Sequence, residues 1–117
     1  METFRKILAA AVQGGASDVH LKIGTPIVFR INRRLVVVEG PTPTEEWMHT
    51  IVENILPRHA KKILEENHEC DFSYFAPEIG RFRTNCFYQR GQPCLAMRYV
   101  KTNVPSFEEL GLLPVLT

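Results

Sequence analysis

The chain has 117 residues, of which 44% are hydrophobic and 23% are charged, and its formal net charge at pH 7 is +1. These proportions are typical of a globular protein with one core, and no apolar run approaches the about 18 residues that a membrane-spanning helix needs. A net charge near zero gives no support for general nucleic-acid binding. Its three cysteines have no CxxC spacing, so neither a disulfide framework nor a metal site is expected. We expect one domain over residues 1–117, in a reducing cytoplasm and without a leader peptide.

The first half of the chain predicts helices and strands in alternation. Apolar residues recur at helical spacing and then alternate with polar ones, which is the period of a strand. Asn32-Arg33 predicts a tight hairpin connection, and Pro57 must interrupt the later helical stripe because it has no N–H to donate. The expected elements are a helix from Phe4 to Val12, strands over 18–23, 27–31 and 35–38, and a helical pair over about 44 to 67 that carries Trp47 on its apolar side.

The second half returns to strand character. Expected strands cover 69–75, 81–88 and 94–100, and the capping-box spacing of Ser106 to Glu109 opens a short helix that Gly111 ends. The full order is helix, three strands, two helices, three strands and helix. This order predicts an α+β fold with a mostly antiparallel sheet and helices packed on one face.

The stretch GRFRTNCFYQRGQPCLAMR, from Gly80 to Arg98, places four arginines in two predicted strands and their turn. A two-residue turn at Arg90-Gly91, with the apolar residues of both strands on one face, fixes the pairing. The predicted opposed pairs are Gln89 with Gln92, Phe82 with Tyr99, Thr84 with Met97, and Arg83 with Arg98. The face opposite the core then carries Arg81, Arg83, Asn85 and Arg98.

Two like charges that oppose each other on a sheet are unfavourable unless something negative lies between them. A bound phosphate or carboxylate would meet this need, because a guanidinium group grips such anions bidentately and stays charged. The alternative is that the arginines form ordinary surface ion pairs with Asp71, Glu78 or the carboxylates of the helical pair. The residue types alone leave both interpretations open.

Other polar residues give weaker signals. Asp18 and His20 share a strand face and could act as an acid/base pair, but no third group completes a catalytic constellation, so they are better explained as solvent-facing neighbours. Cys86 falls on the expected core face and is better explained as a small buried hydrophobe than as a nucleophile. The chain contains no GxxxxGK[ST] motif, so no catalytic residue for ATP hydrolysis is expected in it.

Three segments resemble a known family: GASDVHLKIGTPIVFRIN, CDFSYFAPEIGRFRTNCFYQRG and VPSFEELGL are similar to the N-terminal domain of PilT-type pilus retraction motors, within the secretion superfamily of hexameric ATPases. The resemblance runs from Phe4 to Leu113. It implies a PAS-like fold and a longer parent, in which a RecA-like ATPase domain with its Walker A motif follows and uses ATP and Mg²⁺. It also implies a cytoplasmic homo-hexamer that works with the inner-membrane pilus machinery in retraction and twitching motility.

The resemblance also assigns the arginines. It implies that Arg83 and Arg98, with Arg81 as a weaker third, contact the phosphates of a nucleotide held by the RecA-like domain of the same or a neighbouring subunit. The family commonly has Asp-Gly where this chain has Asn32-Arg33. The loss of the glycine puts the geometry of that hairpin in doubt, but not the fold. Two alternatives remain: a free-standing PAS-like module that senses or binds a small anion, and the same domain in a pilus assembly or type II secretion ATPase.

Overall fold

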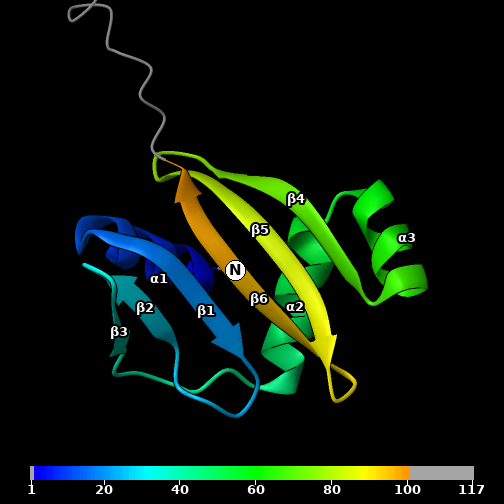
Figure 1. Ribbon diagram of the computed structural model, residues 1–117, viewed down its shortest axis with the longest axis horizontal. Coiled ribbons are helices and arrows are strands. Elements are labelled where there is room, and N and C mark those ends of the chain that lie inside the picture. The colour runs from blue at the N-terminus through cyan, green and yellow to red at the C-terminus, as the bar shows by residue number, and fades with distance from the viewer. Residues whose placement is uncertain (1, 101–117) are drawn as a thin grey trace, which may run out of the picture.

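The described part of the chain, residues 2–100 of the computed structural model, folds as a six-stranded antiparallel sheet with helices (Figure 1). The predicted α+β class is therefore confirmed, and the short helix predicted at Ser106 lies outside the described residues. The elements are α1 (Glu2–Gln13), β1 (Ala16–Lys22), β2 (Val28–Ile31), β3 (Arg34–Val37), α2 (Glu45–Ile55), α3 (Arg58–Asn67), β4 (Glu69–Ala76), β5 (Gly80–Gln89) and β6 (Gln92–Val100).

The sheet joins two three-stranded meanders from opposite ends of the chain. Its strand order is β3-β2-β1-β6-β5-β4, and the central pairing, β1 with β6, is antiparallel like all the others. Each meander is local in sequence, whereas the β1–β6 pairing connects the first and the last of the strands within residues 2–100. This long-range pairing determines which side chains of the two halves become neighbours.

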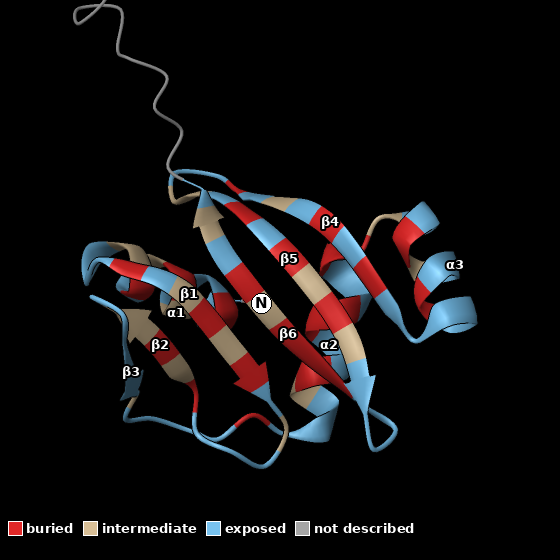
Figure 2. Ribbon diagram, viewed as in Figure 1, coloured by how far each residue is buried: buried red, intermediate tan, exposed pale blue. Residues whose placement is uncertain are grey.

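The helices leave one face of the sheet uncovered among the described residues. α1 packs against β1, α2 against β6 and α3 against β4, and in Figure 1 α1 and α2 lie behind the sheet. Figure 2 shows buried residues alternating with exposed ones along β4 and β5, as expected for a sheet with one face on the core. The largest fully buried side chains include Phe4, Leu8, Met48, Ile51, Phe82, Leu95 and Met97. We call the uncovered side the open face.

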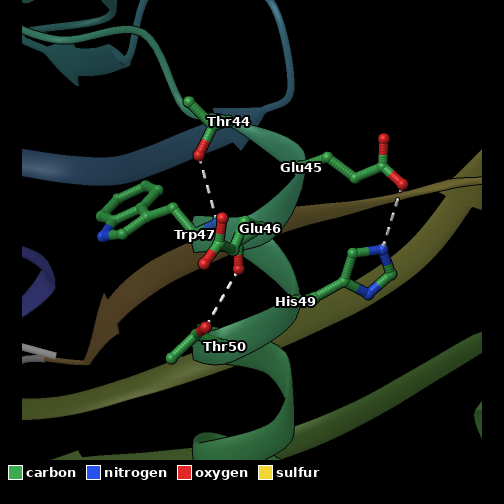
Figure 3. Close-up of polar contacts among 6 residues, drawn as sticks. All are labelled: Thr44, Glu45, Glu46, Trp47, His49 and Thr50. Carbon is green, nitrogen blue, oxygen red and sulfur yellow. Dashed lines mark hydrogen bonds and ion pairs between the residues drawn. The ribbon is translucent and has the colours of Figure 1, made fainter.

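The start of α2 shows how local sequence sets a helix boundary (Figure 3). The Thr44 hydroxyl accepts a hydrogen bond from the backbone N–H of Trp47 at 3.1 Å, and Glu45 and Glu46 lie in the first turn near the positive end of the helix dipole. Trp47, expected in the core, is partly buried and packs against it. Pro57 is the residue that precedes α3, so the predicted interruption of the helical stripe is confirmed.

Both predicted two-residue hairpin turns are present. Asn32 and Arg33 have φ values of 51° and 67°, and Arg90 and Gly91 have φ values of 55° and 78°. Positive φ at both central residues is the requirement of a type I′ turn, and Asn adopts this conformation more readily than most residues. The absence of glycine at 32–33 therefore leaves the hairpin intact. None of the described helices is long and apolar enough to cross a membrane.

Candidate functional site

The β5–β6 hairpin places Arg83 directly opposite Arg98. Their Cα atoms are register partners, as are those of Phe82 and Tyr99, of Thr84 and Met97, and of Gln89 and Gln92. Phe82, Thr84 and Met97 are buried and Arg83 and Arg98 are exposed. The predicted register is confirmed, and the two guanidinium groups belong to the open face.

A row of charged and polar residues extends from this pair across the sheet. Asp18 on β1 is the register partner of Arg98 on β6 and of Arg30 on β2. Arg83 on β5 follows Arg98, and Ser73 on β4 follows Arg83. Five adjacent strands thus contribute Arg30, Asp18, Arg98, Arg83 and Ser73 in that order. A single carboxylate in this row lies between two arginines.

Asp18 and Arg98 form an ion pair. The Nε atom of Arg98 lies 3.5 Å from Oδ2 of Asp18, and the Asp18 side chain is only 14% exposed while that of Arg98 is 73% exposed. The other carboxylate oxygen of Asp18, Oδ1, accepts a hydrogen bond of 2.7 Å from the Ser17 hydroxyl. The carboxylate is therefore held at both oxygens, whereas most of the guanidinium group remains accessible.

Two of the carboxylates that the sequence suggested as arginine partners, Glu78 and Asp71, form no ion pair with Arg81, Arg83 or Arg98 among residues 2–100. Glu78 pairs with Arg5 at 4.0 Å, and Asp71 accepts a hydrogen bond of 3.1 Å from the Asn85 amide. The ion-pair partner of Arg98 is Asp18, which the sequence pattern relates only to His20. It could not be connected to Arg98 from local patterns, because their contact depends on the β1–β6 pairing between the two ends of the chain.

The arginine pair borders a hollow on the open face. This hollow has a volume of about 260 Å³ and is lined by Asp18, Asp71, Arg83, Asn85, Ala96 and Arg98. Its lining carries two guanidinium groups and two carboxylates, so their formal charges cancel. Within residues 2–100 Arg83 forms no ion pair, whereas Arg98 is paired with Asp18. Arg83 is therefore the more available of the two cations for an incoming anion.

Arg81 is on the same face but apart from this hollow. Its register partners are Phe75 on β4 and Val100 on β6, and its guanidinium carbon lies 6.0 Å from the centre of the Phe75 ring. This distance is within the range of a cation–π contact. The structure thus brings Arg83 and Arg98 together with Asp18, and places Arg81 on an aromatic neighbour instead.

The remaining candidates show no catalytic arrangement. His20 has a buried Nε2 atom without a hydrogen-bond partner in the described part of the chain, and its register partners are Val28 and Ala96. Burial raises the pKa of Cys86 from 9.0 to about 12, with smaller contributions from Cys70 and Cys94. A thiol so disfavoured as a thiolate is a poor nucleophile. Among residues 2–100, no cluster of His, Cys, Asp or Glu is arranged to hold a metal ion.

These observations define an α+β domain with an arginine pair on an uncovered face of its sheet. Comparison with known proteins shows which family this domain resembles. No family model matches the chain. The type IV pilus ATPase PilU of Pseudomonas aeruginosa is 35% identical over 97% of the chain, and the pilus retraction ATPase PilT of the same organism is 32% identical over 92%. The uncharacterised protein YggR of Escherichia coli is 32% identical over 95%.

Solved structures agree. A crystal structure of the pilus retraction motor PilT with bound ADP superimposes with a TM-score of 0.78 at 36% identity and covers 92% of this chain. The ATPase DotB of Legionella pneumophila, at 22% identity, has a TM-score of 0.72 over 95% of the chain and shows likeness of fold. The resemblance to the N-terminal domain of PilT-type ATPases is thereby confirmed. The chain spans about a third of the length of these relatives: 30% of PilU, 31% of PilT and 33% of YggR.

Proposed function

We propose that this chain is the N-terminal regulatory and assembly domain of a longer, cytoplasmic hexameric ATPase that powers type IV pilus retraction. The observation that carries the proposal is the opposed pair Arg83 and Arg98 on the open face, in a chain similar to PilT and PilU over almost its whole length. The rest of the parent would supply the RecA-like domain with ATP and Mg²⁺. The PAS-like description of the fold stays a prediction.

Arg83 and Arg98 would act on the nucleotide through charge. A phosphate placed between two opposed guanidinium groups turns their mutual repulsion into attraction to a shared anion. Charge spreads over the phosphoryl oxygens during transfer, and fixed cations stabilise it, as an arginine finger does. Arg81, which lies over Phe75, would have a secondary part in this contact. No residue of this chain is assigned a covalent or proton-transfer step.

The charge balance of the hollow supports a nucleotide that is held by another domain. Asp18 and Asp71 line the same hollow as the two arginines, so the local site has no excess positive charge with which to capture a free polyphosphate. A RecA-like domain that already holds the nucleotide can present its phosphates to the arginines at high effective concentration. Closure of the two domains would then depend on the phosphates that are bound.

The experiment is ATP turnover by the full-length protein with Arg83→Ala or Arg98→Ala. Removing a charge that stabilises the transferring phosphoryl group is expected to lower kcat by about 10³-fold or more, with the hexamer intact by size-exclusion chromatography. Arg90→Asn is the matched control: it removes an arginine from the same hairpin, and Asn-Gly is a preferred type I′ turn. Near-normal turnover in the Arg83 and Arg98 variants would show that these arginines are ordinary surface charges.

The alternative of a free-standing anion-binding module has a simple test in the coding sequence beyond residue 117. A Walker A motif within a few tens of codons supports the motor, and a stop codon directly after residue 117 supports the free module. The similarity to the pilus retraction ATPase PilT favours retraction over assembly or type II secretion as the process served. Loss of pilus retraction, with assembly preserved, on deletion of the full-length gene is the corresponding phenotype.

A further inference from the structure

We infer that Asp18 is a positioning residue for Arg98: it holds the guanidinium group by its Nε edge and leaves the outer nitrogens directed to an anion on the open face. This inference rests on the proposed function, in which Arg98 meets a nucleotide phosphate. Neither the sequence pattern nor the similarity to pilus ATPases indicates this role for Asp18.

The first support is the place of Asp18 in the sheet. Its register partner on one side is Arg98 and on the other is Arg30, so its carboxylate lies between two cations in a row across three strands. A carboxylate exposed over only 14% of its side chain loses much of its hydration, which is favourable only when charged or polar partners replace the water. The ion pair with Arg98 at 3.5 Å and the Ser17 hydroxyl at 2.7 Å provide that replacement.

The second support is an irregularity in β1. The β1–β2 register shifts between Ala16 and Asp18, which pair with the consecutive residues Ile31 and Arg30, so that Ser17 is an extra residue. A bulge of this kind re-aims side chains and is over-represented next to functional sites. Here the extra residue is the one whose hydroxyl donates to Oδ1 of Asp18. The bulge therefore supplies the second contact that fixes the carboxylate while Oδ2 faces Arg98.

The third support is the geometry left to Arg98. A guanidinium group has five donors in a planar fork, and an ion pair at Nε leaves the far side of the fork available. The Arg98 side chain is 73% exposed and borders the hollow that also contains Arg83. An arginine without such a tether would distribute among many rotamers, and positioning it beforehand removes part of the entropy cost of meeting the phosphate.

The decisive measurement is steady-state ATP hydrolysis by the full-length protein with Asp18→Asn, Arg98→Ala and the double variant. Asp18→Asn preserves the size of the side chain and removes its charge, so kcat is expected to fall by about 10- to 100-fold through misplacement of Arg98. If Asp18 acts through Arg98, the double variant turns over no more slowly than Arg98→Ala alone, because the two losses are not additive.

A second readout separates positioning from general destabilisation. Affinities for ADP and for a non-hydrolysable ATP analogue are measured on the same variants. If a positioned contact to the terminal phosphate is lost, the affinity for the ATP analogue falls more than the affinity for ADP. A structural defect lowers the two affinities to the same extent. Glu53→Gln, which breaks the Lys61–Glu53 ion pair of 3.2 Å on the helical side of the fold, is the control and is expected to match the wild type.

The outcomes distinguish this inference from the proposed function. Normal kcat in Asp18→Asn beside an impaired Arg98→Ala overturns the inference alone, as do additive losses in the double variant or equal weakening of both nucleotides. Normal kcat in Arg98→Ala overturns the proposed role of that arginine itself. Should Asp18→Asn fail to assemble, Ser17→Ala keeps the ion pair but removes the second anchor; a smaller loss in the same direction supports the inference, and wild-type kinetics with wild-type nucleotide preference contradicts it.

Discussion

Arg83 and Arg98 show how far local sequence carries the prediction of a site. Because they lie in one hairpin, the turn at Arg90-Gly91 and the alternation of apolar residues predict correctly that they are register partners. Asp18 comes from the other end of the chain, and its contact with Arg98 depends on which strands become neighbours at the centre of the sheet. The alternation of apolar and polar residues indicates which face of the sheet a residue lies on, but not which residue is its partner on the next strand. The contact between Asp18 and Arg98 could therefore not be predicted from the sequence.

Cys86 makes a prediction about pH at the same scale. Its pKa is raised by burial from 9.0 to about 12, while in the unfolded chain the thiol ionises at its ordinary value. Above pH 9.0 the folded state therefore binds more protons than the unfolded state, and the stability present below pH 9.0 is lost as the pH rises towards about 12. The free energy of unfolding in urea, measured at a series of alkaline pH values, is expected to fall less steeply for Cys86→Ala than for the wild type.

The quantity that tests the role of Cys86 is the slope of the free energy of unfolding against pH, and not the free energy at any one pH. Alanine at this position leaves a small void in the core, so the variant is less stable than the wild type below pH 9.0, and the difference shrinks as the pH rises. Cys70, the cross-strand partner of Cys86, also has a pKa raised by burial, and its contribution to the slope is common to both proteins. Parallel curves for the two proteins would show that the Cys86 thiol does not govern the alkaline range.

At the scale of elements, the helical pair and the hairpins were predictable because their signals are local. Thr44 caps α2, Pro57 separates α2 from α3, and two positive-φ turns connect neighbouring strands. The register shift at Ser17 left no such signal. A bulge is set by the fit of two strands to each other, and a single strand can present the same alternation with or without the extra residue.

Gly80 is a position where a contact with another strand, and not the local turn alone, requires glycine. It begins β5 with a φ of 144°, and a Cβ built on it would lie 2.6 Å from a ring carbon of Tyr99 on β6. Gly80→Ala is therefore expected to destabilise the fold by about 1 to 3 kcal/mol beyond the backbone cost, because the Tyr99 ring, which packs against Phe82, must shift to admit the new methyl group. Chemical denaturation measures the loss.

The matched control is Gly40→Ala. Gly40 has a similar φ of 150° but no atom within 4 Å of a Cβ built on it, so it shares the backbone cost and lacks the clash. The difference between the two variants isolates the contact with Tyr99. Equal destabilisation of the two proteins would mean that the ring adjusts freely, and that the close approach at the start of β5 adds nothing to the stability of the β5–β6 hairpin.

For the whole molecule, class and layer order followed from the sequence, whereas the strand order across the sheet and the charge balance on its open face did not. Both depend on the joining of the two meanders through β1 and β6. Local patterns define each meander but do not rank the ways in which two meanders can be placed side by side. The compensation of the arginines by Asp18 and Asp71 became visible only with that arrangement.

The balanced charges yield a prediction for the 117-residue chain alone. Titration with Mg²⁺-ATP in a calorimeter is expected to give no measurable binding, because the hollow offers no net positive charge and the chain has no Walker A motif. The full-length protein, titrated under the same conditions, is expected to bind ATP. Tight binding of ATP by the short chain would place a complete nucleotide site within these residues and contradict the need for a second domain.

The strand at the other end of the sheet has a consequence for the behaviour of this domain in solution. β3 is an outer strand, paired only with β2 in the described part of the chain, and Leu35, Val36 and Val37 are exposed on it. A short apolar run with unpaired backbone groups is a template for edge-to-edge aggregation. Arg33 and Arg34 precede the run and Glu39 follows it, in the positions of charged gatekeepers. The charges at both ends of β3 are therefore expected to oppose edge-to-edge pairing of two copies of the domain.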